Sequence, residues 1–110
     1  MNVVSMRNTI RDSKLMGINI TYTEDDINIS ILLEKNDISR ILTIQQVESY
    51  ELNCYNQQGY SYIERVKIVE TANGFYISLD PYDETVTPNE NDNDCITAKY
   101  IDLKELENAK

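Results

Sequence analysis

The chain has 110 residues, with 19 Asp and Glu against 10 Lys and Arg, no histidine, and a formal net charge of −9 at pH 7. This length matches a common single-domain size, so one domain is expected over residues 1–110. The negative charge argues against direct binding of nucleic acid or of an anionic membrane surface, since both depend on Lys and Arg. Without histidine, Ser–His and Cys–His catalysis and His-containing zinc sites are excluded.

No signal peptide or membrane span is predicted from the sequence. The basic positions Arg7 and Arg11 are not followed by an apolar run of the signal-peptide kind. No stretch approaches the roughly 20 apolar residues of a transmembrane helix. We therefore expect a cytoplasmic protein whose two cysteines, Cys54 and Cys95, stay reduced. Two cysteines are too few for the usual structural zinc site, and no cofactor or metal is expected.

The N-terminal third predicts one short helix and one β-hairpin. Residues 1–16 predict a helix or an ordered arm, because apolar side chains recur there near helical spacing. From Ile18 the apolar period changes to two, and residues 18–22 and 27–33 each place isoleucines on one face. The polar residues 23–26 connect these two strands as a turn.

Residues 38–47 fit two structures. Ile38, Leu42 and Ile44 would lie on the same face of a β-strand. Ile38 and Leu42 also have the spacing of one face of a helix, which would begin at Asp37. We favour the strand. The composition of residues 53–59, NCYNQQG, predicts a loop after it.

A second hairpin is predicted in the following segment. Residues 60–70 alternate as one amphipathic strand, with Lys67 on its polar face. Asn73 and Gly74 then give the strongest hairpin signal in the chain, because both tolerate the positive φ of a type I′ turn. Residues 75–79 form the returning strand.

The C-terminal segment completes the fold prediction. Residues 95–101 predict a further strand, and Asp102 with Glu105 resembles the capping box of a short helix through Leu103 and Leu106. The expected fold class is mainly β or α+β: an antiparallel meander of about six strands, curled or sandwich-like, with short terminal helices.

The connection at residues 80–94, DPYDETVTPNENDND, contains both prolines, six carboxylates and no basic residue. A connection of this length is usually functional or disordered. It is not an EF-hand, because counting from Glu90 puts Cys95 where Gly is required and Ile101 where the bidentate Glu belongs. An irregular calcium site remains an alternative.

A catalytic pair made by Asp80 and a carboxylate of residues 90–94 lacks the apolar cleft that would raise a carboxyl pKa. We therefore predict no catalytic residues and no enzyme.

A binding surface for a basic protein is the favoured interpretation of this connection, with a merely solvated loop as the competing one. Carboxylates accelerate encounter and fix register, and tyrosines supply buried area. The predicted partner-binding residues are Asp80, Tyr82, Asp83, Glu84, Glu90, Asp92 and Asp94. A second candidate set consists of Glu24, Asp25 and Asp26, together with Tyr76.

The run FYISLDPYDE at residues 75–84 and the run DNDCITAKYIDL at residues 92–103, with the small size and acidity of the chain, resemble the immunity proteins encoded beside bacterial polymorphic or contact-dependent toxins. The resemblance implies a cytoplasmic inhibitor that binds one cognate toxin domain, often a basic nuclease, and covers its active site with acidic side chains. The alternatives are a phage-type nucleic-acid mimic, such as an anti-CRISPR or anti-restriction protein, and a calcium-stabilised interaction module.

Overall fold

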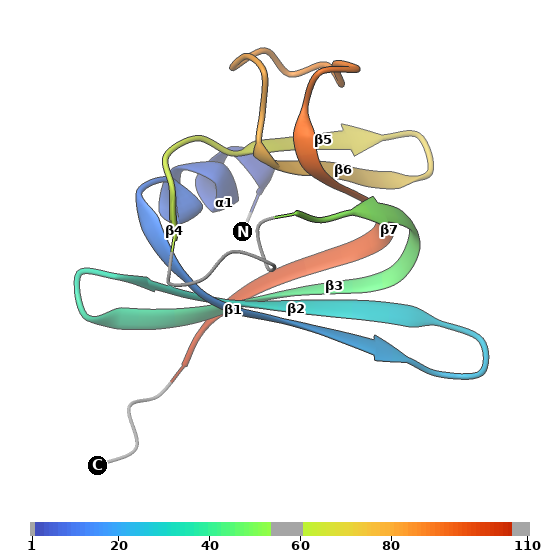
Figure 1. The fold of residues 1–110 in the computed structure, drawn as a ribbon, viewed down its shortest axis with the longest axis horizontal. Helices are drawn as coiled ribbons and strands as arrows, with labels where there is room; N and C mark the ends of the chain where they lie inside the picture. Colours follow the sequence, from blue (N-terminus) through green and yellow to red (C-terminus); the bar gives the residue numbers. More distant parts are fainter. Residues whose placement is uncertain (1, 54–60, 107–110) are drawn as a thin grey trace.

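The computed structural model describes residues 2–53 and 61–106, which form one helix and seven strands (Figure 1). All strand pairs are antiparallel, in the order β4-β1-β2-β3-β7-β6-β5. The elements are α1 Val3–Ile10, β1 Ser13–Tyr22, β2 Ile27–Lys35, β3 Ile38–Glu51, β4 Ser61–Ile63, β5 Lys67–Thr71, β6 Gly74–Asp80 and β7 Asn93–Glu105.

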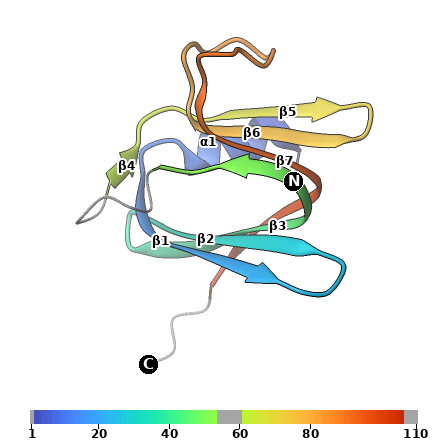
Figure 2. The ribbon, with the colours of Figure 1, turned by 45° about the vertical axis from the view of Figure 1, so that its right-hand side comes forward.

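The sheet curls into a half-barrel around a single hydrophobic core. In both ribbon views the β5–β6 hairpin lies over α1, and β1, β2 and β3 lie beneath the helix (Figures 1 and 2). The helix begins with an Asn2 cap, whose side chain accepts a hydrogen bond from the Ser5 N–H, and it buries Met6 and Ile10. The inner face of the sheet supplies the rest of the core, largely from alternate isoleucines and leucines such as Ile29, Ile31, Leu42, Ile44, Ile77 and Ile96.

The curl arises where β3 bends. The first part of β3 pairs with both β2 and β7, but pairing with β2 ends at Ile29 and Ile44. Beyond that point Gln46 has a φ of 53°, and the register with β7 shifts between Val47 and Ser49. The Asn28 side chain accepts a hydrogen bond from the Gln46 N–H at 3.2 Å and so satisfies the backbone at the bend. A bulge of this kind bends a strand and increases its twist.

The predicted fold class is confirmed: the protein is mainly antiparallel β with one short helix. The first hairpin is present as β1 and β2, the helix lies within residues 1–16, and the ambiguous segment 38–47 is a strand. The described residues contain seven strands rather than about six.

The extra strand arises because residues 60–70 do not form a single strand. Ser61–Ile63 pairs with β1 at one edge of the sheet, and Lys67–Thr71 pairs with β6 at the other. The chain crosses between the two edges at residues 64–66. The period of two breaks at this crossing, because Ile63 and Val66, three residues apart, are both buried while Glu64 and Arg65 between them are exposed.

The predicted C-terminal helix is wrong within the described residues. β7 continues to Glu105, with Leu103 buried opposite Leu42 and Glu105 paired with Arg40 at 3.3 Å. Pairing with the long strand β3 therefore overrides the local capping signal at Asp102. Residues 107–110 lie outside the described residues, as do residues 54–60 with Cys54 and most of the predicted loop.

The second hairpin is present, but its turn differs from the prediction. Thr71 pairs with Gly74, so the two turn residues are Ala72 and Asn73, and neither has a positive φ. A type I′ turn at Asn73-Gly74 is therefore wrong. Gly74 is the first residue of β6, where its φ is 151° and an added Cβ would lie 2.2 Å from the carbonyl oxygen of Ala98. The glycine is needed for close approach to β7 rather than for the turn.

Candidate functional site

The acidic connection folds onto the outer face of the β5–β6–β7 part of the sheet. The row Ile68, Ile77 and Ile96 faces the core, so the adjacent row, in which Lys67 pairs with Ser78, faces away from the core. The connection runs over this outer face above β5 and β6 (Figures 1 and 2). Lys67 is consequently buried, with only 1% of its side chain exposed.

The Lys67 ammonium makes contacts with three residues of the connection. Its Nζ donates to Asp83 Oδ1 at 2.8 Å, to the main-chain carbonyl of Thr87 at 2.8 Å, and to the two carboxylate oxygens of Asp92 at 3.1 and 3.0 Å. The three donors of a lysine are thereby used, and the buried charge is paired with two carboxylates.

Asp92 holds the connection together through several hydrogen bonds, and its side chain is completely buried. It accepts hydrogen bonds from the backbone N–H groups of Tyr82 at 2.8 Å and Asn89 at 2.9 Å. The Tyr76 hydroxyl donates to the same carboxylate at 2.8 Å. One buried carboxylate thus joins both ends of the connection to Lys67 and Tyr76 of the sheet. We call this cluster of Lys67, Tyr76, Asp83 and Asp92 the lysine hub.

The hub stabilises the charged forms of its lysine and carboxylates. Burial opposes the charge on Lys67, but Asp83 and Asp92 outweigh it and raise the pKa of Lys67. The hydrogen bonds from Lys67 and Thr85 lower the pKa of Asp83 to about 2. Burial also opposes the charge on Asp92, but its N–H, hydroxyl and ammonium donors keep its pKa below the usual value. Burial and the bonds to Cys95 and Asp92 raise the pKa of Tyr76, which stays neutral and donates.

These shifts predict how stability depends on pH. Because the folded pKa values of Asp83 and Asp92 lie below the ordinary 3.8, their stabilisation is complete above that pH and is lost as the pH falls toward about 2. The raised pKa of Lys67 gives stabilisation that persists below pH 10.5 and is lost at higher pH. We expect the urea midpoint to fall as the pH is lowered from about 4 to 2, and Asp83→Asn to flatten that fall. Glu84→Gln is the control; equal slopes for both variants would contradict the role of Asp83.

The structure places the seven predicted partner-binding residues in two groups. Three are used within the domain: Asp83 and Asp92 in the hub, and Asp94, which is buried and accepts the Asn53 N–H at 2.6 Å. Tyr76, from the second candidate set, also belongs to the hub. The other four predicted residues are exposed at or near the connection: Asp80, Tyr82, Glu84 and Glu90. Of these, Glu84 also forms an exposed ion pair with Arg11 at 3.6 Å. Val86, which was not predicted, is exposed beside them at 62%, like Tyr82.

Sequence analysis missed Lys67, which it placed on a solvent-facing side. The available signal was indirect: Lys67 stands between the apolar residues Val66 and Ile68, and the connection that follows is rich in carboxylates but has no cation of its own. A buried lysine beneath such a loop supplies the missing charge.

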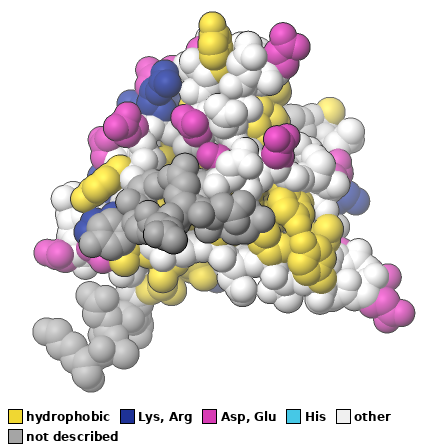
Figure 3. All heavy atoms as spheres, viewed as in Figure 1, with side chains coloured by type: hydrophobic (Ala, Val, Ile, Leu, Met, Phe, Trp, Pro, Cys, Tyr) yellow, Lys and Arg dark blue, Asp and Glu magenta, His cyan; other side chains and the backbone are white. Residues whose placement is uncertain are grey.

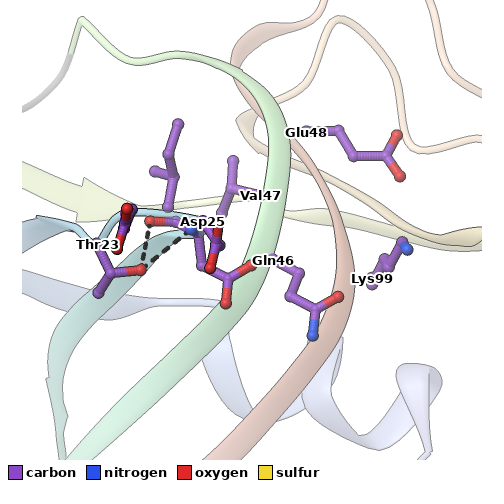
Figure 4. A pocket seen from close by; sticks show the side chains of 9 residues that line it. Thr23, Asp25, Gln46, Val47, Glu48 and Lys99 are labelled. Atoms are coloured by element: carbon purple, nitrogen blue, oxygen red, sulfur yellow. Dashed lines mark hydrogen bonds between the residues drawn. The ribbon is translucent and has the colours of Figure 1, made fainter.

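The second acidic cluster lies at the tip of the β1–β2 hairpin, away from the connection (Figures 1 and 3). Thr23 closes the turn through its hydroxyl, which accepts the Asp26 N–H at 3.0 Å. Where β3 bends away from β2, the turn borders an open hollow of about 350 Å³. Figure 4 shows its lining side chains, which come from the turn, β3 and β7: Thr23, Glu24, Asp25, Asp26, Ile27, Gln46, Val47, Glu48 and Lys99.

The described part of the chain has neither a cluster of metal-ligating side chains nor a membrane-spanning helix. Within residues 2–53 and 61–106, no group of three or more His, Cys, Asp or Glu side chains is arranged to hold a metal ion. No helix of the described chain is long and apolar enough to cross a membrane. In the connection itself, the Lys67 ammonium occupies the position between Asp83 and Asp92 that a bound cation would need.

Comparison with known proteins gives no relative: no family model matches the chain, and neither curated proteins nor solved structures give a significant match.

Proposed function

We propose that the protein is a non-catalytic, cytoplasmic binding protein that neutralises a basic partner, a cognate toxin domain encoded by a neighbouring bacterial gene. The proposed contact surface is the exposed side of the acidic connection: Asp80, Tyr82, Glu84, Val86 and Glu90. Asp83, Asp92 and Asp94 position this surface from within the domain instead of contacting the partner.

The observation that carries the proposal is the anchoring of the connection by the lysine hub. Ile68 of β5 and Ile77 of β6 are buried in the core on the inner face of the sheet. The connection lies on the opposite, outer face, so it does not cover these core residues. The loop is nevertheless tied by a buried ion pair and by hydrogen bonds at both ends. A binding loop held in one shape loses less conformational entropy when a partner binds.

The chemistry of the exposed side suits a basic protein surface. Tyr82 and Val86 are each 62% exposed and provide apolar area, and Glu84 and Glu90 lie exposed beside them. Exposed tyrosines are favourable anchors at interfaces, and the net charge of −9 accelerates encounter with a basic partner. Figure 3 shows acidic side chains around this end of the molecule.

The test is co-expression with the toxin domain encoded by the adjacent reading frame. We expect the wild-type chain to restore growth and to copurify with that domain. Changing Asp80, Glu84 and Glu90 to lysine should abolish rescue, because the six-unit change of charge repels a basic surface while leaving the lysine hub intact. Changing Glu24, Asp25 and Asp26 to lysine is the matched control with the same change of charge. If the lysine variant of the connection still restores growth and the lysine variant of the hairpin tip does not, the proposed interface is wrong and the partner binds the hairpin tip.

A nucleic-acid mimic is the second candidate, because exposed carboxylates lie at two ends of the molecule, on the connection and at the hairpin tip. A mimic predicts that both triple-lysine variants lose binding and that DNA competes with the protein for its partner. A calcium-stabilised module has less support, since Lys67 already neutralises the carboxylates of the connection.

A further inference from the structure

Two arginines of the chain itself contact the acidic connection at residues on either side of Tyr82. Arg65 donates from Nη2 to the main-chain carbonyl of Pro81 at 3.3 Å. Arg11, which follows α1, places its Nη2 3.6 Å from Glu84 Oε1. Among the exposed carboxylates of the proposed contact surface, Glu84 is the one that forms an ion pair within the described part of the chain. The connection thus already contacts guanidinium groups of its own domain.

The ion pair between Arg11 and Glu84 is weak. Its N···O distance of 3.6 Å is too long for a hydrogen bond, and the two side chains are 39% and 57% exposed. The Nε of Arg11 is covered and has no hydrogen-bond partner within residues 2–53 and 61–106. Exposed ion pairs of this kind contribute little, because water and salt screen them. A cation that binds Glu84 with better geometry can therefore displace Arg11.

We propose that the partner presents an arginine that takes the place of Arg11 at Glu84 and stacks on the ring of Tyr82. This inference rests on the proposed function and names the chemical group that the contact surface recognises. In the free protein, Arg11 occupies the position of the partner's guanidinium and thereby weakens binding.

Tyr82 is well placed to bind a planar cation. Its backbone N–H donates to the buried Asp92 carboxylate at 2.8 Å, and the preceding Pro81 is itself buried. The backbone is fixed by these contacts, whereas the side chain is 62% exposed. A guanidinium stacks on a tyrosine ring and can bind a carboxylate through two parallel hydrogen bonds, but a lysine ammonium is a strongly hydrated point charge. At equal charge, this surface favours arginine over lysine.

The backbone of Glu84 is fixed in the same way. The preceding Asp83 binds Lys67 at 2.8 Å, and the following Thr85 donates its N–H and its hydroxyl to Asp83 at 3.3 and 2.8 Å. None of these contacts uses the Glu84 side chain. Its carboxylate is therefore available to a partner once Arg11 has moved away.

Titration of the full chain with hexa-arginine and with hexa-lysine, followed by the amide chemical shifts of the connection, tests the arginine site. Because the toxin domain is absent from this experiment, a failure of the site is distinguished from a failure of the proposed function. We expect hexa-arginine to bind about two- to fivefold more tightly than hexa-lysine, which is the gain from stacking on an exposed ring. Tyr82→Ala should remove this preference.

Arg11→Gln should tighten the binding of hexa-arginine about two- to fivefold, because Glu84 then has no internal cation. Lys104→Gln is the matched control: it removes the same charge and an ion pair of the same length, 3.6 Å to Asp102, at the other end of β7 from the connection. In a Glu84→Gln background, Arg11→Gln should lose most of its effect, because the two residues act through one contact.

Four results would overturn the proposal: no binding of either peptide, equal affinity of the wild-type chain for both, an unchanged preference for hexa-arginine in Tyr82→Ala, or equal effects of Arg11→Gln and Lys104→Gln.

Discussion

Replacement of Lys67 by methionine is expected to lower the free energy of unfolding by about 3–5 kcal/mol, the usual cost of removing one partner of a buried ion pair. The cost is high because the Asp92 side chain is fully covered and would keep its charge without a cation. Urea unfolding followed by circular dichroism measures the change.

The double variant Lys67→Met with Asp92→Asn separates charge from packing. Tyr82 and Asn89 donate to different oxygens of Asp92, so asparagine can keep only one of these two N–H bonds. No buried charge remains in the double variant, however, so part of the lost stability should return. If Lys67→Met lowers the free energy of unfolding by less than about 1 kcal/mol, the ion pairs of the lysine hub are not buried as described.

Gly74→Ala is expected to destabilise the protein by about 3 kcal/mol, from backbone strain and overpacking together. The added Cβ would lie 2.2 Å from the Ala98 carbonyl oxygen and 2.9 Å from the Lys99 Cα, which are backbone atoms of β7. The φ of 151° adds strain for any residue with a side chain. Thermal unfolding and urea unfolding both report this loss.

Gly17→Ala is the matched control, because a Cβ at Gly17 meets nothing within 4 Å and the residue lies in an exposed part of β1. Its effect should stay within about 1 kcal/mol and can be stabilising. Equal effects at the two glycines would contradict the close approach of β6 to β7.

The sequence predicted the elements whose pattern is local. Residues 27–31 alternate between isoleucine and a polar residue, and β2 buries Ile29, Ile31 and Leu33 on one face as expected. Prediction from the sequence failed where pairing with a residue far away in the chain determines the secondary structure. The capping signal at Asp102 is local, but Leu103 pairs with Leu42, some sixty residues away in sequence. Pairing of that range leaves no trace in the periodicity of a short segment.

The internal structure of the acidic connection could not be predicted from the sequence. The carboxylates of residues 80–94 indicated a special connection, yet composition does not distinguish those that face solvent from those that fold inward. That distinction depends on Lys67, whose burial results from a loop that begins more than ten residues later. Tyr76 was predicted as a surface anchor and instead donates to Asp92 within the hub.

The central claim is that the connection, held by the lysine hub, presents its exposed carboxylates to a basic partner. The most direct test is the association rate constant for the proposed partner, a basic toxin domain expected from an adjacent reading frame, measured by stopped flow at low and high salt. We predict that changing Asp80, Glu84 and Glu90 to lysine slows association about ten- to hundredfold at low salt and flattens its salt dependence. An unchanged rate and salt dependence for this variant, with slowing in the Glu24, Asp25 and Asp26 variant, would contradict the claim.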